Sequence, residues 1–194
     1  MDGAMPTVND VKEKIAQFNA ENEEVEWLLT ELFAKYPKNT DFNEVLLKTK
    51  VLNSLYSTNI LAVGAVARHI VELPDLDALL AAGSPNAVNL IAKVSIQDKG
   101  FWFFSFATKY CSWHNPSAYP IFDKNVYACL RFYRKQDSFA KFALKDLWDY
   151  PILLKAVTEF RAVYGLEQFN FKELDKFLYQ HGEELSSPSG KNEA

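Results

Sequence analysis

The segment Tyr-Pro-Ile-Phe-Asp-Lys-Asn-Val, residues 119–126, decides most of what this sequence predicts. A proline braces the apolar residues that precede Asp123, and a helical pattern begins directly after it. Asp123 therefore lies where the N-cap of a helix is expected, and the amides of the first turn would keep its carboxylate ionised. One interpretation is an N-cap that contributes about 1 kcal/mol to stability. The other is a fixed anion that points at a ligand.

Helical periodicity surrounds this segment on both sides. Apolar residues recur at a spacing of three and four, and most prolines and glycines fall between the periodic stretches. Asp41 is a suitable N-cap with Glu44 as its capping-box partner, and Ser84-Pro85 is suited to open another helix. The predicted helices cover residues 25–33, 41–55, 61–73, 76–82, 84–96 and 101–113, a stretch carrying Val126, Leu130 and Tyr133, and residues 152–164 and 171–179.

The stretch from Phe101 to Trp113 is apolar nearly all round, which predicts a buried central element. Its aromatic run is also compatible with a strand, but its length favours a helix. Asn115-Pro116 then predicts a turn before the Asp123 segment.

Composition bounds the class of protein. The chain has 194 residues, of which 48% are apolar and 14% aromatic, so it is expected to fold as one domain or two small subdomains. The longest apolar run, Ile60–Ala67, is far shorter than the roughly twenty residues of a membrane span. No signal peptide is visible, so a cytoplasmic location is expected.

Few residues have the spacing of a metal or nucleophile site. Cys111 and Cys129 lie inside apolar stretches and are interpreted as buried, inert thiols. His69, His114 and His181 are far apart in the sequence, so they are interpreted as surface or capping residues, and no metal is expected.

Charge is distributed unevenly although the net value is only −4. Residues 1–47 carry a net −6, residues 93–145 a net +6 and residues 146–194 a net −4. A basic middle between acidic ends can form a positive patch on an acidic protein. The alternative is that solvated faces happen to differ in sign.

Residues 119–126 resemble the catalytic loop of the helix-hairpin-helix DNA glycosylases, the superfamily of endonuclease III and the adenine glycosylases. In that loop an apolar residue, a proline, an apolar residue and a variable one precede the aspartate, and a helix with basic residues follows, as Arg131 does here. Residues 51–58, Val-Leu-Asn-Ser-Leu-Tyr-Ser-Thr, are similar to the segment that lies against the lesion-bearing strand, although only Thr58 matches its Gln- and Thr-rich end. The resemblance covers about 45–135.

The sequence departs from this family at two functional positions. Residues 98–104, Asp-Lys-Gly-Phe-Trp-Phe-Phe, replace the glycine-rich hairpin that holds a DNA phosphate and keep a single glycine. The register of the family's lysine nucleophile falls on Phe104 and Ser105, so no Schiff-base activity is expected. Lys109 lies one turn beyond Ser105 and either reaches the site or extends to solvent as a snorkelling side chain. The family's iron–sulfur loop is absent.

The sequence thus predicts an all-α protein with two packed helical subdomains of the helix-hairpin-helix DNA glycosylase type. One glycosylase-like domain is expected over residues 7–185, with loose tails at 1–6 and 186–194. A middle subdomain of about 48–135 would pack against a second one built from both chain ends. That pairing would group the two acidic segments away from the basic one.

The resemblance implies hydrolysis of the N-glycosidic bond of a flipped base in DNA, by a monofunctional glycosylase without a cofactor. Asp123 is the implied catalytic residue, with Lys109 as a second candidate. Lys99, Gly100, Thr58, Lys124 and Arg131 are the expected DNA-binding residues, and Trp102, Tyr110, Trp113 and Tyr119 the expected walls of a base pocket. The alternatives are a non-catalytic module of the same fold that binds nucleic acid or protein, and a plain helical interaction protein.

Overall fold

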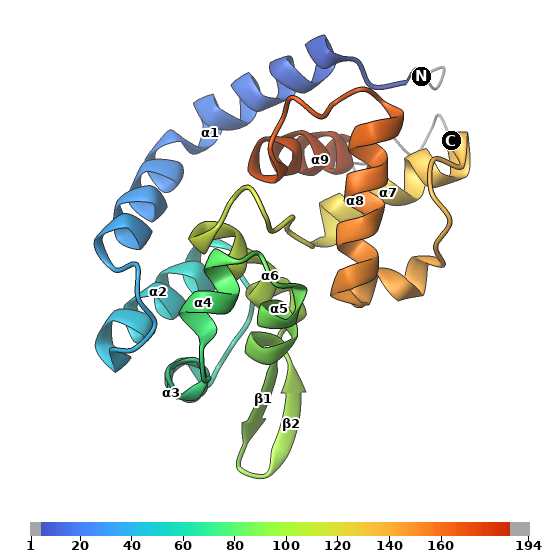
Figure 1. Cartoon of the computed structure of the whole chain (residues 1–194). Helices are drawn as coiled ribbons and strands as arrows, with labels where there is room; N and C mark the ends of the chain where they lie inside the picture. The colour runs from blue at the N-terminus through green and yellow to red at the C-terminus, as the bar shows by residue number, and fades with distance from the viewer. Residues whose placement is uncertain (1–4, 187–194) are drawn as a thin grey trace. The chain divides into compact units, whose positions relative to one another are not determined.

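The computed structural model describes residues 5–186 and is mostly helical, as predicted (Figure 1). The helices and strands are α1 (Val8–Lys35), α2 (Phe42–Leu55), α3 (Val63–Glu72), α4 (Leu76–Ala81), α5 (Pro85–Ala92), β1 (Lys93–Ile96), β2 (Lys99–Trp102), α6 (Phe104–His114), α7 (Lys124–Asp137), the 3₁₀ helix η1 (Leu144–Trp148), α8 (Tyr150–Val163) and α9 (Phe171–Ser186). None of the helices in residues 5–186 combines the length and hydropathy that crossing a bilayer requires.

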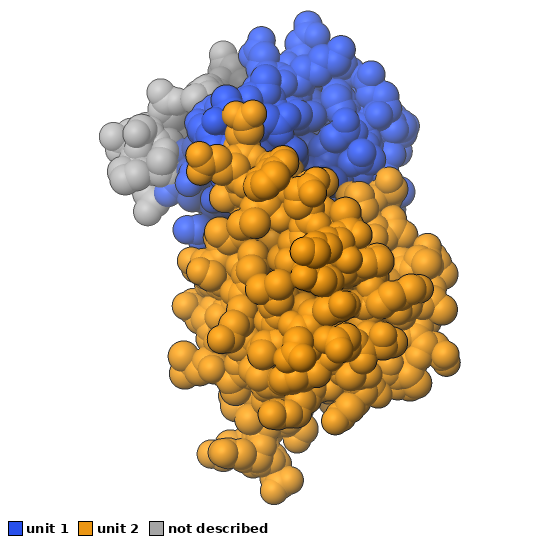
Figure 2. Space-filling view, turned by 90° about the vertical axis from the view of Figure 1, so that its left-hand side faces the viewer, with its two compact units in different colours: residues 1–22, 120–194 blue, residues 23–119 orange. Residues whose placement is uncertain are grey.

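The chain divides into two compact units, which Figure 2 colours separately. Unit 2 runs from Glu23 to Tyr119, and unit 1 combines the residues up to Asn22 with those from Pro120 onward. The chain passes from unit 1 to unit 2 inside α1, where Asn22 has non-helical backbone angles (φ −126°, ψ 18°). Unit 2 begins and ends earlier in the sequence than the predicted middle subdomain of about 48–135, and α7 lies with the chain ends in unit 1.

This division also corrects the expected charge separation. The basic stretch 93–145 is split at Tyr119, so the exposed cations of α7 and the following loop lie in unit 1 with the chain ends. Of the expected tails, residues 1–4 and 187–194 lie outside the described residues. Pro6 is buried, and Ser186 is the last residue of α9, where its hydroxyl donates to the Gly182 carbonyl.

Unit 2 is built around α6, which is buried along most of its length, as predicted. α2 packs against α3 and α6, and α5 packs against α6. The predicted N-cap of α2 is confirmed, because Asp41 Oδ1 accepts from the amides of Asn43 and Glu44 at 2.8 and 3.0 Å. Pro85 lies in the first turn of α5, and Ser84 is its N-cap residue, as predicted. The Ser84 side chain, however, makes no capping hydrogen bond.

A β-hairpin replaces the expected ends of two helices. α5 ends at Ala92 rather than Ile96, α6 begins at Phe104 rather than Phe101, and β1 and β2 pair antiparallel between them, with Val94 opposite Phe101. Gln97 and Asp98 form a two-residue turn with positive φ of 50° and 62°, as a type I′ turn requires. Figure 1 shows the hairpin projecting from the helices of its unit.

Unit 1 is held by the packing of α7 against α9. The two helices approach closely at Gly182, where a Cβ atom would lie 1.9 Å from the Asn125 carbonyl oxygen. The first half of α1 is fixed to α9 by an ion pair between Lys14 and Glu184 and by an edge-on contact of Phe18 with Tyr179. The predicted stripe of Val126, Leu130 and Tyr133 is buried.

Candidate functional site

Asp123 is the N-cap of α7, as predicted. Its Oδ1 accepts from the amide nitrogens of Asn125 at 2.9 Å and Val126 at 3.0 Å. These bonds place the carboxylate at the positive end of the helix dipole, where a negative charge is stabilised. The side chain is half-buried, so it is partly desolvated without being sealed from water.

The residues before Asp123 fix this carboxylate in place. Ile121 and Phe122 are each 2% exposed, and the hydroxyl of Tyr150 donates to the Pro120 carbonyl at 3.2 Å. On the outside, the half-exposed Trp148 meets Phe122 edge-on, with ring centroids 4.9 Å apart. The proline-braced triplet therefore works as anticipated, because its apolar side chains are anchored in the core of unit 1.

Asn125 adds a polar group that sequence reasoning missed. It is 1% exposed, and its Nδ2 has no hydrogen-bond partner within residues 5–186. The nearby Lys124 and Arg131, both expected to contact DNA, are exposed on α7.

Lys109 lies in unit 2, so the two expected catalytic residues belong to different units. Its side chain is only 2% exposed, and Nζ donates to Ser105 Oγ at 2.9 Å and lies 5.3 Å from the centre of the Tyr56 ring. The snorkelling interpretation is wrong, because a snorkelling lysine keeps its ammonium group in water. Burial and a serine partner instead hold Lys109 in one position.

The expected walls of a base pocket separate into two groups. Tyr110 and Tyr119 are fully buried in unit 2; the Tyr110 hydroxyl donates to Asn39 Oδ1 at 2.5 Å, and the Tyr119 hydroxyl lies 3.0 Å from the carbonyl oxygens of Leu79 and Ser84. Both are core residues with satisfied hydroxyl groups, so they do not wall an open pocket.

Trp113 and Trp102 retain some exposure. Trp113 is half-buried and donates from Nε1 to the Tyr56 hydroxyl at 3.0 Å. Trp102 is 47% exposed on β2 and stacks on the buried Phe104 at 5.9 Å, with ring planes 9° apart. Only Trp102 is thus a substantially exposed aromatic surface among the four expected pocket residues.

Strand β2 and the loop after α2, both in unit 2, hold the remaining expected DNA contacts. Lys99 and Gly100 are exposed on β2. Thr58 lies in the loop after α2, and its hydroxyl donates to Asn53 Oδ1 at 2.8 Å. Asn53 also bonds both backbone groups of Ile60, so the loop is braced, and it leaves Leu61 fully exposed.

A buried lysine in unit 2 was not anticipated from the sequence. Lys48 is 0% exposed, and its Nζ donates to the carbonyl oxygens of Tyr36 (3.0 Å) and Lys38 (2.8 Å) and to Asn39 Oδ1 (2.8 Å). His114 Nε2 lies 3.3 Å from the same nitrogen. His114 is therefore part of this network rather than a surface or capping residue.

Burial controls the ionisation of both groups. Desolvation lowers the pKa of Lys48 to about 8, partly offset by Asp77 and Glu44. Desolvation, together with the nearby charge of Lys48, lowers the pKa of His114 to about 3. A neutral His114 can then accept from the Lys48 ammonium group. The network joins the connection between α1 and α2 to α6, which is a structural role.

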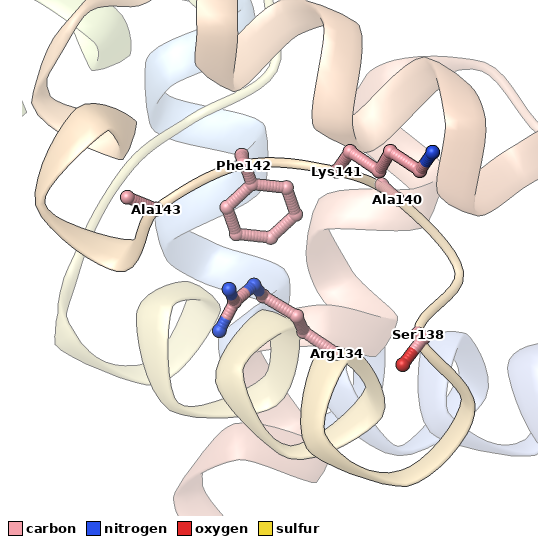
Figure 3. A pocket seen from close by; sticks show the side chains of 6 residues that line it. All are labelled: Arg134, Ser138, Ala140, Lys141, Phe142 and Ala143. Atoms are coloured by element: carbon pink, nitrogen blue, oxygen red, sulfur yellow. The ribbon is translucent and has the colours of Figure 1, made fainter.

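A shallow pocket of about 610 Å³ lies in unit 1, at the C-terminal end of α7 (Figure 3). Its lining residues are Arg134, Ser138, Ala140, Lys141, Phe142 and Ala143. The Arg134 guanidinium lies over the Phe142 ring, 5.4 Å from its centre. None of its lining residues was an expected site residue, although Arg131 lies one helical turn before Arg134. The basic composition of residues 93–145 was the other signal in the sequence.

Among the described residues, neither the two cysteines nor a cluster of metal-ligand side chains forms a further candidate site. Cys111 and Cys129 are fully buried as predicted, and burial raises the pKa of each thiol well above its usual value. Within residues 5–186, no three His, Cys, Asp or Glu side chains gather as metal ligands.

Comparison with known proteins identifies the family. Residues 8–118 match the HI_0787_N family model, described as an N-terminal domain. A Haemophilus influenzae protein that bears the name "Uncharacterized protein" is 40% identical over 154 residues, which cover 79% of this chain and 73% of that relative. The chain therefore belongs to the HI_0787_N family. No solved structure matches it significantly.

The family match and the structure agree on one boundary. The match ends at residue 118, and unit 2 ends at Tyr119. Lys48, Lys109 and the β-hairpin therefore lie inside the matched region, whereas Asp123 and the Arg134 pocket follow it.

Proposed function

We propose that this protein is a monofunctional DNA N-glycosylase whose two helical units are of the helix-hairpin-helix glycosylase type, with Asp123 as its catalytic carboxylate. The observation that carries the proposal is the half-buried Asp123, fixed by two amide hydrogen bonds at the start of α7. The two amides and the helix dipole stabilise a negative charge at this partly desolvated position, as the reaction requires.

The reaction breaks the bond between C1′ of the sugar and the nitrogen of the base. Positive charge develops on the sugar as the base leaves with the bonding electrons, and an ionised Asp123 stabilises that charge. A water molecule then forms the new C1′–O bond, and Asp123 can orient it and accept its proton. No metal or organic cofactor is needed for this step.

Unit 2 supports a nucleic-acid partner through its exposed groups. The braced loop after α2 presents Leu61, and the β-hairpin presents Trp102 with Lys99 nearby in the sequence. Exposed apolar and aromatic side chains can insert between bases or stack on them, and lysines contact phosphates. A flipped base requires such groups to hold the opened strand.

A second candidate function is a non-catalytic module of the same fold that binds nucleic acid. The observation that favours it is the β-hairpin in place of a glycine-rich loop between two helices. The turn residues Gln97 and Asp98 carry side chains, so they do not form the open row of glycine amides that holds a phosphate.

The test compares two N-caps of the same kind. Asp123→Asn and Asp41→Asn each retain a good N-cap, and each replaced aspartate accepts two first-turn amides. Base release is measured on duplexes with uracil, hypoxanthine, an oxidised purine or mispaired adenine. We expect Asp123→Asn to lose activity by about a hundredfold or more, with melting temperatures nearly unchanged, and Asp41→Asn to remain active.

Two outcomes would contradict the proposal. A wild-type protein that binds these duplexes but releases no base is the non-catalytic module. Equal activity of Asp123→Asn and the wild type would assign Asp123 to capping alone.

Borohydride trapping on an abasic duplex supplies a further check, since a monofunctional enzyme forms no Schiff base. A trapped complex that disappears in Lys109→Ala would make Lys109 a nucleophile.

A further inference from the structure

The last turns of α7 and the following loop carry an excess of exposed positive charge. Between residues 131 and 145 the cations are Arg131, Arg134, Lys135, Lys141 and Lys145. Asp137 is the single acidic residue of that stretch, and its carboxylate accepts from the Tyr164 hydroxyl at 2.6 Å. None of the five cations forms an ion pair with another residue in the range 5–186.

The helix dipole explains only part of this cluster. Arg134 and Lys135 lie in the last turn of α7, where cations interact favourably with the carbonyl ends. Arg131 lies one turn earlier, and Lys141 lies beyond the helix, so neither gains from that turn. Mutual repulsion among unpaired cations opposes folding, unless an anion binds there in the functional state.

Arg134 has the geometry of an anion receptor. One face of its guanidinium lies over the Phe142 ring, which orients the group without using its N–H donors. No hydrogen bond from these donors is formed within the described residues, and the side chain is half-buried. A planar fork that is held in place with its donors unused matches the oxygen atoms of a phosphate.

The pocket around Arg134 supplies space and further donors. Figure 3 shows the guanidinium beneath Phe142 at one end, the Ser138 hydroxyl at the other, and Lys141 extending from the loop away from Phe142. Ser138 ends α7 with a positive φ of 50°, which turns the chain back over the helix and forms the pocket wall. The volume of about 610 Å³ is ample for a phosphate group with its sugar.

We infer that the Arg134 guanidinium in this pocket binds a backbone phosphate of a nucleic-acid strand, while Lys141 and the neighbouring cations contact adjacent phosphates. Five cations spread over α7, the following loop and η1 suit an extended polyanion better than one small phosphate, which two or three donors satisfy. This inference extends the proposed function by placing a backbone contact in unit 1, and it rests on DNA as the partner.

The test measures the salt dependence of DNA binding. Binding of a fluorescently labelled duplex is followed by anisotropy at salt concentrations from about 50 to 200 mM, where counterion release dominates. Arg134→Gln/Lys141→Gln is compared with Lys12→Gln/Lys155→Gln, which removes the same charge from exposed positions of unit 1. We expect the log–log slope to fall by about 0.9 per lost phosphate contact, hence by about 2, in the pocket variant. Arg134→Lys should keep most of the slope, because it keeps the charge.

The outcomes separate this inference from the glycosylase activity. Equal slopes for the pocket variant and the control variant would overturn the pocket assignment, even if Asp123 proves catalytic. A reduced slope in a protein that releases no base would support the pocket and remove only the enzymatic step. If the wild-type protein binds no DNA, the inference is wrong, because the partner that it requires is excluded.

Inorganic phosphate distinguishes a strand from a free anion. Its binding is followed by the NMR signal of Arg134 Nε–H in the wild-type protein. If phosphate shifts this signal while the DNA slope is the same in both double variants, the pocket binds a small phosphate and the inference is wrong. Competition between phosphate and the duplex, lost in the pocket variant, supports it.

Discussion

The two units treat their positive charges in opposite ways. In unit 2, Lys48 is completely buried and is surrounded by four acceptors, three oxygens and the His114 ring nitrogen. In unit 1, Arg134 and Lys141 line an open pocket without an ion pair in the described part of the chain. A cationic side chain is thus bonded to protein acceptors in one unit, whereas the two pocket cations of the other unit have no ion pair within residues 5–186.

This difference teaches how to separate structural cations from binding cations. Lys48 needs no external ligand, because the protein itself supplies the acceptors that desolvation demands. Arg134 is already oriented, and its donors make no hydrogen bond within residues 5–186, so under our inference a bound phosphate supplies its acceptor. Degree of burial and number of partners, rather than residue type, indicate which role a cation has.

Acidification tests the Lys48 network with the largest expected effect. The pKa of His114 is about 3 in the folded protein against 6.5 as its ordinary value, so the unfolded chain binds more protons between those values. Stability is therefore retained above about pH 6.5 and lost as the pH falls toward 3. We expect a loss of about 3 kcal/mol at pH 4 from this group alone, measured by urea unfolding.

The control for this effect is a pair of histidine variants. His114→Gln retains an acceptor for Lys48 and removes the titration, so its stability should vary less between pH 7 and pH 4. His69→Gln should keep the wild-type acid loss. An identical acid profile in His114→Gln and wild type would show that His114 does not couple to folding.

Removing the buried ammonium group has the next largest effect. Lys48→Met keeps most of the side-chain volume but leaves the carbonyl oxygens of Tyr36 and Lys38 without their donor. Unpaired buried acceptors cost about 1–3 kcal/mol each, and relief from burying a charge offsets part of this cost. We expect a net loss of about 2 kcal/mol by denaturant unfolding. If Lys48→Met is as stable as the wild type, the hydrogen bonds of Lys48 contribute nothing to stability and the proposed structural role is wrong.

The smallest effect is expected at the pocket. Lys141→Gln removes an exposed charge that has no ion pair in residues 5–186, so the free energy of unfolding should change by less than about 0.5 kcal/mol. A small gain is consistent with relief of repulsion from the other cations. A loss comparable to that of Lys48→Met would mean that Lys141 supports the fold, and the contrast between the units would fail.

Helix positions were predictable because apolar spacing and capping residues agree locally. Asp41 and Asp123 both cap helices as their sequences indicate. The β-hairpin was not predictable from the same signals, since Gln97-Asp98 lacks the Asn-Gly pattern typical of a type I′ turn. Its aromatic strand also continues directly into the aromatic start of α6, which conceals the boundary.

The candidate site was predictable only where local sequence determines it. The Asp123 carboxylate depends on neighbouring residues, whereas the burial of Tyr110 and Tyr119 depends on acceptors far away in the sequence, at Asn39 and Leu79. Lys48 did carry a signal, because it lies three residues after Val45 and four before Leu52, on the apolar face of α2. The cations around Arg134 were visible as composition, but their pocket depends on the fold.

The passage of the chain between the units has a consequence for synthesis on the ribosome. Unit 2 is one continuous stretch, so it can complete its contacts while α7, α8 and α9 are still being made. The first half of α1 must wait for α9, its partner through Lys14 and Phe18, across all of unit 2. During that interval its apolar face is open to the α9 of another nascent chain. Exchange of this segment between two copies is therefore the misassembly to which this topology is most exposed.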